Sequence, residues 1–223
     1  MKTKILGSLI ASFLIAGAAQ AQQVISYFAQ IPQATTNWTQ TLQLPSFDSG
    51  LGTLTQVKLS YTGDVWQSLF AENTSLANAS TYNLTTTATL TLGKQGGPTL
   101  FAPTPIAFNR AGPVLGYDGN LDFGGTSGVT FNQQTTVNGT YFDGDLPSYL
   151  GLGPINFVAS ASGLSTLISG GNFVKGALTS AATGLSVEYT FTAIPEPSAY
   201  AAIFGAAALA FVTIRRRLVR SID

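Results

Sequence analysis

Apolar and polar residues alternate over long stretches of the chain between residues 38 and 191, and this pattern limits the fold more than any other feature. The alternation is clearest in residues 38–44, 57–61, 82–92 and 185–191. Successive side chains of a strand point to opposite faces, so a period of two gives one buried face and one face in contact with water. Threonine fills many of the polar positions, which favours strands over helices. The pattern therefore predicts an all-β fold.

Turn signals separate the alternating segments. They lie at residues 48–50, 63–64, 93–98, 118–119, 138–139, 143–144 and 170–172, and each contains glycine. Asn138-Gly139 predicts a two-residue hairpin, and Asp145 with Pro147 predicts one short helical turn that Asp145 caps. We expect about nine to eleven strands, arranged as an antiparallel β-sandwich that is jelly-roll-like.

The chain contains no histidine and no cysteine. Ser-His-Asp triads, histidine general bases, thiolate nucleophiles, disulfides and the common zinc sites are therefore excluded. Residues 22–193 carry four basic and eight acidic side chains, a net charge of −4. Nucleic-acid binding needs a basic patch, so this composition also argues against a nucleic-acid partner.

The N-terminus has the three parts of a secretory signal peptide. Lys2 and Lys4 form a basic segment, residues 5–18 are apolar, and Ala19-Gln20-Ala21 matches the small-residue cleavage pattern. We predict a signal helix within residues 1–21, cleavage by signal peptidase after Ala21, and a mature chain that begins at Gln22.

The C-terminal segment, residues 194–223, has a similar three-part order. Pro195-Glu196-Pro197 precedes an apolar run from Ala199 to Ile214, and a cationic cluster follows it, made of Arg215, Arg216, Arg217 and Arg220. The run has about 16 residues, or roughly 24 Å as a helix, which is slightly short for a hydrocarbon core of about 30 Å. We nevertheless predict a C-terminal transmembrane helix, with the arginines as a cytoplasmic stop.

The tail resembles the PEP-CTERM sorting signal of exported proteins from Gram-negative bacteria that make extracellular polysaccharide. The resemblance implies that an exosortase-type enzyme reads Pro195, Glu196 and Pro197 and removes the tail. The precursor would then sit in the inner membrane, and the mature protein would move to the cell surface or extracellular matrix.

Residues 22–193 are similar to the choice-of-anchor E domain. The matching stretches are residues 44–54, 72–73, 122–128, 145–153 and 187–191. That family implies an extracellular β-domain and supplies no catalytic residues.

Asp118, Asn120 and Asp122 place oxygen ligands at alternating positions, as calcium loops do. However, Phe123 stands where an EF-type loop has glycine, and Val129 stands where it has a bidentate glutamate. The segment is therefore either a calcium site or a simple Asp-Gly turn between strands. No other cofactor is expected.

Two further candidates are left open by the sequence. Asp143 or Asp145 could form a glycosidase pair with Glu72 or Glu188, if their carboxyls lie about 5–10 Å apart. Aromatic residues could instead provide a sugar-stacking platform or fill the core; they are Tyr27, Trp38, Tyr61, Trp66, Tyr82, Tyr117, Tyr141 and Tyr149.

The favoured function is a non-enzymatic, exported protein with a structural or adhesive role at the cell surface or in an exopolysaccharide matrix. The alternative is a carbohydrate- or calcium-binding module of that matrix, with extracellular polysaccharide as partner. An exposed row of aromatic residues beside residues 118–124 would favour this alternative. A cleft with two facing carboxyls would favour a hydrolase.

Overall fold

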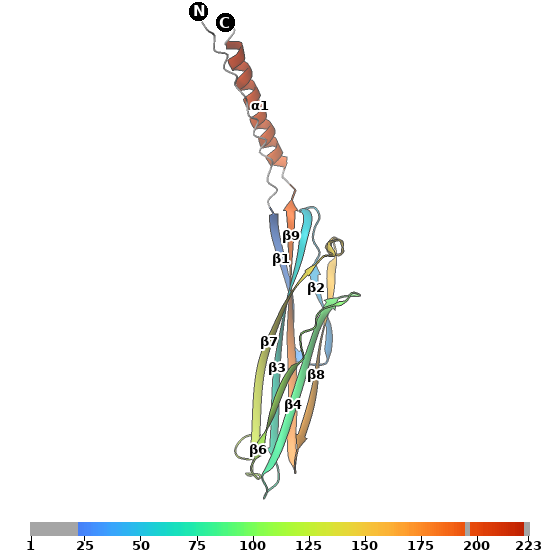
Figure 1. The fold of residues 1–223 in the computed structure, drawn as a ribbon, viewed down its shortest axis with the longest axis vertical. Coiled ribbons are helices and arrows are strands. Elements are labelled where there is room, and N and C mark those ends of the chain that lie inside the picture. Colours follow the sequence, from blue (N-terminus) through green and yellow to red (C-terminus); the bar gives the residue numbers. More distant parts are fainter. Residues whose placement is uncertain (1–21, 195–196, 221–223) are drawn as a thin grey trace, which may run out of the picture.

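The computed structural model describes residues 22–194 and 197–220, and its described strands form two antiparallel sheets (Figure 1). The strands are β1 Gln22–Thr35, β2 Trp38–Pro45, β3 Gly52–Asn73, β4 Ser80–Lys94, β5 Thr99–Phe101, β6 Ile106–Val114, β7 Gly128–Asp143, β8 Pro154–Ser169 and β9 Phe173–Ala193. A 3-10 turn, η1 Leu146–Tyr149, and a helix, α1 Pro197–Arg220, complete the elements. The predicted signal peptide, with Ala19 and Ala21, lies outside the described residues, as do Pro195 and Glu196.

The strands pair as a nested set. One sheet has the order β1-β9-β3-β7, and the other has the order β2-β8-β4-β5, with β6 also paired to β4. Thus β1 pairs with β9, β2 with β8, β3 with β7 and β4 with β6, all antiparallel. The prediction of an antiparallel all-β fold is confirmed, and the described strands lie in two sheets.

The core lies between the two sheets and contains the inward positions of the predicted alternation. Leu59 and Val187 of the first sheet share one buried cluster with Leu90 and Phe157 of the second. A second buried cluster, which includes Leu69 of β3, lies further along the sheets. Because each sheet buries one face against the other, the period of two is explained by packing alone.

Aromatic residues close the end of the sheets at which β9 ends. Tyr189 packs edge-on against Phe47 and Tyr149, with ring centroids 5.8 and 6.1 Å away. The Phe47 N–H donates to the Tyr149 carbonyl at 2.8 Å, and the Tyr149 hydroxyl donates to Asp143 Oδ2 at 2.7 Å. The first of these bonds holds Phe47 beside η1, and the second joins η1 to the end of β7.

The short helical turn is confirmed as η1, but the predicted cap is wrong in its chemistry. Asp145 precedes η1 and makes no side-chain capping bond. Its N–H instead donates to Asp143 Oδ1 at 2.9 Å. Asp143 therefore organises this turn, because its carboxylate accepts bonds from both Asp145 and Tyr149.

Two predicted turns are strand interiors. Gly63-Asp64 lies within β3, and Asn138-Gly139 lies within β7. A Cβ on Gly63 would lie 2.5 Å from the Tyr61 hydroxyl and 2.6 Å from a Leu90 methyl group, and one on Gly139 would lie 2.8 Å from the Phe101 ring. These glycines are there because facing side chains occupy the space of a Cβ, not because the chain reverses.

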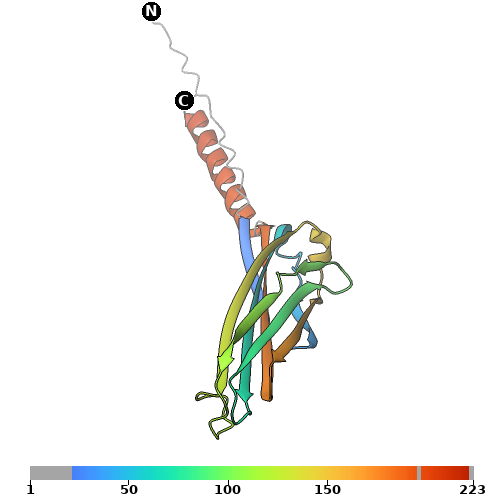
Figure 2. The same cartoon turned by 60° about the horizontal axis from the view of Figure 1, so that its bottom comes forward.

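Helix α1 contains the apolar run and the arginines at 215, 216, 217 and 220, and it extends away from the sheets (Figure 2). Phe204, Leu209 and Phe211 are exposed on it. Within residues 22–194 and 197–220, no helix combines the length and the apolar content that a membrane crossing demands. The prediction of a transmembrane helix is therefore not supported, since the apolar run is short and the rest of the helix is cationic.

Candidate functional site

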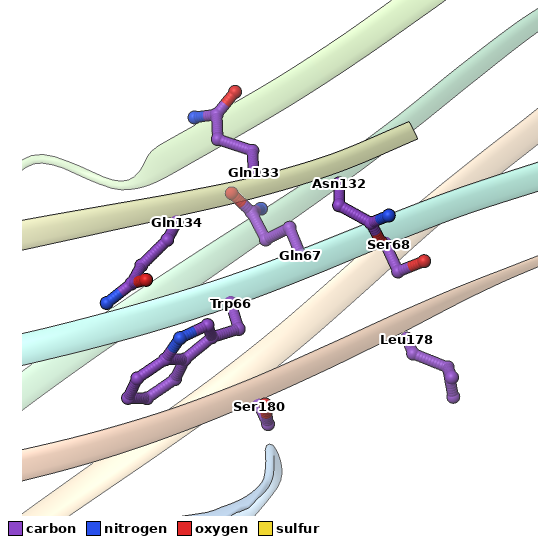
Figure 3. Close-up of a pocket in the computed structure, with 8 residues that line it drawn as sticks. All are labelled: Trp66, Gln67, Ser68, Asn132, Gln133, Gln134, Leu178 and Ser180. Carbon is purple, nitrogen blue, oxygen red and sulfur yellow. The ribbon is translucent and has the colours of Figure 1, made fainter. Parts of the chain in front are cut away.

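The outward-facing side of the β1-β9-β3-β7 sheet carries an aromatic residue surrounded by amides. Odd-numbered residues of β3 from Val57 to Leu69 point into the core, so Trp66 points outward. In register, Trp66 lies between Gln134 of β7 and Ser180 of β9. Figure 3 shows the Trp66 indole beside the Gln134 amide. We call this surface the Trp66 face, defined by Phe28, Asp64, Trp66, Asn132, Gln134 and Ser180.

Two depressions meet at Trp66. The first has a volume of about 420 Å³, and its lining includes Trp66, Asn132, Gln134 and Leu178. The second has a volume of about 330 Å³, and its lining includes Phe28, Asp64 and again Trp66. Because the indole borders both, the depressions form one shallow trough that crosses the sheet from β7 to β1.

Small residues on β9 make room for this trough. Ser180, Ala182 and Gly184 face outward on β9, opposite Trp66, Asp64 and Thr62 of β3. A Cβ on Gly184 would lie 3.0 Å from the Phe28 ring, so this ring lies close against the β9 backbone.

The aromatic surface continues along β3 toward the loop after β6. Phe70 faces outward like Trp66 and lies four residues further on, about 13 Å away. Its ring packs edge-on against Phe123, with centroids 4.8 Å apart. Phe70 also covers Gly176, where a Cβ would lie 2.3 Å from the ring. A row of aromatic side chains therefore runs from the Trp66 face to the Asp118 loop.

The polar groups around Trp66 are nearly all neutral. Among the described residues that line the trough, Asp64 is the sole charged one. Its Oδ1 accepts a bond from the Thr136 hydroxyl, which fixes the carboxylate beside the trough. The amides of Asn132 and Gln134 each offer donors and an acceptor. The arrangement can bind a neutral, hydroxyl-rich ligand through ring stacking and hydrogen bonds.

The carboxylates of the predicted calcium loop are used within the loop. Asp118 Oδ1 accepts the Asn120 N–H at 3.1 Å and Asp118 Oδ2 accepts the Thr126 N–H at 3.2 Å, while Asp122 Oδ1 accepts the Gly124 N–H at 2.8 Å. The Asn120 N–H above all, together with the bonds from Thr126 and Ser127, holds the pKa of Asp118 below its usual value. These contacts favour the turn as the interpretation of this segment, and calcium binding stays a prediction.

The fold does not bring Asp143 and Glu72 together as a glycosidase pair. Asp143 lies opposite Val57 in register, whereas Glu72 lies opposite Gly128. Fifteen residues of strand separate these positions, about 50 Å. Glu188 lies level with Phe142, next to Asp143, but it faces outward with Lys58, to which it forms an ion pair at 3.7 Å, whereas Asp143 lies opposite the inward-facing Val57.

Glu72 is a buried acid whose surroundings the sequence did not predict. Its Oε1 accepts a bond from the Ser127 hydroxyl, and its Oε2 has no partner among the described residues. Neighbouring Asn73 donates to the Leu115 carbonyl at 2.8 Å. Both residues therefore connect the end of β3 to the loop that carries Asp118.

Most of the aromatic candidates fill the core, as one of the two interpretations predicts. Tyr61, Tyr82 and Tyr149 are buried, and Tyr27 and Trp38 pack against the core. Tyr141 is exposed, and Tyr117 and Trp66 are half-buried; of these three, Trp66 faces outward over the trough. Its direction follows from strand parity: if Val57, Leu59 and Tyr61 point inward, position 66 points outward.

The sequence matches no family model and no curated protein. Among solved structures it is similar to the T13 particle of infectious bursal disease virus, at 14% identity over 78% of this chain and 40% of that chain, with a TM-score of 0.23. The structure of the Gx strain of that virus gives 18% identity, 80% and 42% coverage and a TM-score of 0.17. This chain thus spans about two fifths of those chains, and likenesses this weak carry no argument.

Proposed function

We propose that the protein is an exported, non-enzymatic β-sandwich of jelly-roll type that has a structural or adhesive role at the cell surface or in an exopolysaccharide matrix. The Pro195-Glu196-Pro197 motif and the cationic end of the chain support sorting to that location. The nested strand pairing supports the jelly-roll assignment. The Trp66 face carries the adhesive part of the proposal, because it offers a broad polar surface with aromatic side chains.

The sorting step is tested by replacing Glu196. In cells that process the wild type, Glu196→Ala should leave the precursor uncut and retained, because the carboxylate between two prolines is the charged part of the motif. Cell fractionation and the mass of the product measure this. Ser198→Ala, one residue outside the motif, is the matched control and should be sorted normally. Identical processing of Glu196→Ala and the wild type would exclude the motif as the sorting signal.

A second candidate function is carbohydrate binding by the Trp66 face. The specific observation in its favour is the row of Trp66, Phe70 and Phe123, which leads to the Asp118 loop. Sugar rings stack on aromatic faces, and amides satisfy their hydroxyl groups. The net charge of −4 for residues 22–193 favours neutral over anionic polysaccharides.

Binding of neutral polysaccharides to residues 22–193 tests this candidate, with a glycan array followed by calorimetry. Trp66→Ala should weaken binding roughly tenfold or more, the size expected for an aromatic residue at the centre of a site. Leu164→Ala removes an exposed apolar side chain elsewhere and is the control. Equal affinity of the two variants would place any binding outside the Trp66 face.

A further inference from the structure

Strand β7 is the free edge of the β1-β9-β3-β7 sheet. It pairs with β3 from Gly128 to Asp143 without any register shift. In the described part of the chain, the backbone of residues 129–142 makes hydrogen bonds to β3 alone. The outer edge therefore presents a row of unpaired N–H and C=O groups about 48 Å long.

The other edge strands are shorter, interrupted or charged, so β7 is the longest regular edge among the described strands. β1 contains Pro32 and a register shift between Ile31 and Ala34. β2 has 8 residues and ends at Pro45, β5 has 3 residues, and β6 contains Arg110 and Pro113. Prolines, charges, irregularities and short length are the usual means of protecting an edge.

β7 has none of these protections. From Val129 to Phe142 it contains no proline and no charged residue, and its charge is confined to Asp143 at the end. Its outward side chains are exposed and include Asn132, Gln134, Thr136 and Asn138. The strand itself is long, regular and neutral, so neither its backbone geometry nor its own charge opposes the addition of another strand. The Arg110 guanidinium of β6 lies near it, over the Phe131 ring, 5.7 Å from the ring centroid.

We propose that two copies of this chain pair antiparallel through β7, about a two-fold axis. A strand edge can pair with its own copy in this arrangement. When residue i of one copy lies opposite residue j of the other, the two-fold axis also places residue j of the first copy opposite residue i of the second. The two four-stranded sheets then become one continuous sheet. Antiparallel pairing between identical neutral edges leaves no charge opposite a like charge.

The pairing has a geometric result that does not depend on the ligand. Residues 132 and 134 of β7 border the trough at Trp66, so the two Trp66 faces lie on the same side of the joined sheet. The dimer then presents two equivalent surfaces in one plane. A polymeric or repetitive partner would bind it with higher avidity than it binds a single copy.

The first test compares two lysine substitutions in the full chain. Asn138→Lys puts a charge on the outward side of β7, and the two-fold axis brings two such charges to the joined edges. Thr62→Lys puts the same charge opposite Asn138 on β3, one strand inward, and is the matched control. Light scattering over a concentration series should give a dimer for the wild type and Thr62→Lys. Asn138→Lys should raise the dissociation constant about two- to fivefold, because a lysine on the edge strand opposes the addition of another strand.

The second test uses the absence of cysteine from the chain. Single cysteines at positions 132, 134, 136, 138 and 140 are introduced in turn, and Ser186→Cys on β9 is the control. Under mild oxidation, a two-fold axis predicts disulfide formation at one or two neighbouring β7 positions, which identifies the residue at the axis. Circular dichroism checks that each variant folds.

Three outcomes would overturn the proposal. One is light scattering that shows a monomer for the wild-type chain at every concentration of the series. Another is equal association of Asn138→Lys and Thr62→Lys. The third is cross-linking that is as efficient at Ser186→Cys as at any β7 position.

Discussion

Gly63 shows at the scale of one residue how closely the sheets are packed. A Cβ at this position would lie 2.5 Å from the Tyr61 hydroxyl and 2.6 Å from a Leu90 methyl group. We expect Gly63→Ala to lower the free energy of unfolding by about 1–3 kcal/mol, because overpacking forces buried side chains out of their rotamers. Gly144→Ala is the control, since nothing lies within 4 Å of its Cβ position. Urea unfolding measures both, and equal midpoints for the two variants would contradict this account.

Tyr149 makes stability depend on pH in the alkaline range. Burial first, and then its hydrogen bond to Asp143, raises the pKa of Tyr149 above its usual value. The contribution of Tyr149 to the free energy of unfolding is therefore fully present below about pH 10. It falls at higher pH, because the unfolded chain loses the hydroxyl proton while the folded protein keeps it. The slope expected for one such tyrosine is about 1.4 kcal/mol per pH unit.

Tyr149→Phe should reduce this alkaline slope, although it also removes a hydrogen bond worth about 1 kcal/mol at neutral pH. Tyr189, whose pKa burial also raises, should keep part of the dependence. Urea unfolding between about pH 8 and pH 11 checks the prediction. A slope that is the same in Tyr149→Phe and the wild type would show that Tyr149 does not titrate as described.

Local signals at single residues were the weakest part of the prediction from sequence. Glycine marks turns correctly at residues 93–98, 143–144 and 170–172, where strands end. At Gly63 and Gly139 the same signal fails, because side chains occupy the space of a Cβ: Leu90 and Phe101 from the facing sheet and, at Gly63, also Tyr61 of the same strand. Leu90 and Phe101 are distant in sequence, so no local pattern contains them.

At the scale of an element, side-chain carboxylates hold the backbone of the Asp118 loop, residues 115–127, in place. Asp118→Ala removes the acceptor for the Asn120 and Thr126 N–H groups. We expect the exchange of these two amide hydrogens to become about three- to tenfold faster. Asp122→Ala is the matched control and should affect the Gly124 amide instead. Unchanged exchange at Asn120 in Asp118→Ala would contradict the role assigned to this carboxylate.

The same loop is where the calcium prediction is tested. Calorimetric titration of the wild type with calcium should give no heat if the turn is the whole role of these carboxylates. Binding heat that Asp118→Ala removes would instead establish a calcium site, because this residue is shared by both interpretations.

Strands were predicted well because their signal is periodic and long. The alternation over residues 82–92 lies within β4, and that over 185–191 lies within β9. Parity places Trp66 on the outer face only because β3 continues through Gly63-Asp64, where the sequence predicted a turn. The trough beside it could not be predicted, since it depends on which strands are neighbours, and this is set by pairing between distant segments.

At the scale of the whole molecule, the first strand is held by the last. β1 pairs with β9 over most of its length, and its inward residues Ile25, Tyr27 and Ile31 contact the core. Removal of residues 22–35 should therefore abolish cooperative thermal unfolding. Removal of residues 197–220 is the control and should change the melting temperature by at most a few degrees, because α1 extends away from the sheets (Figure 1). A cooperative transition in the shorter chain would show that β1 is dispensable.

The position of β9 decides how the protein would respond to a pulling force. β9 leads directly toward α1, and it lies between β1 and β3. Tension between the C-terminal segment and a ligand held on the Trp66 face would run along the strand axes. It would load the hydrogen bonds of β9 with both neighbours at the same time, in shear. Tension between the two chain ends would instead separate β1 from β9 one bond at a time, starting at Gln22 and Thr192. The fold is therefore mechanically strong in the direction that adhesion would use and weak across its termini.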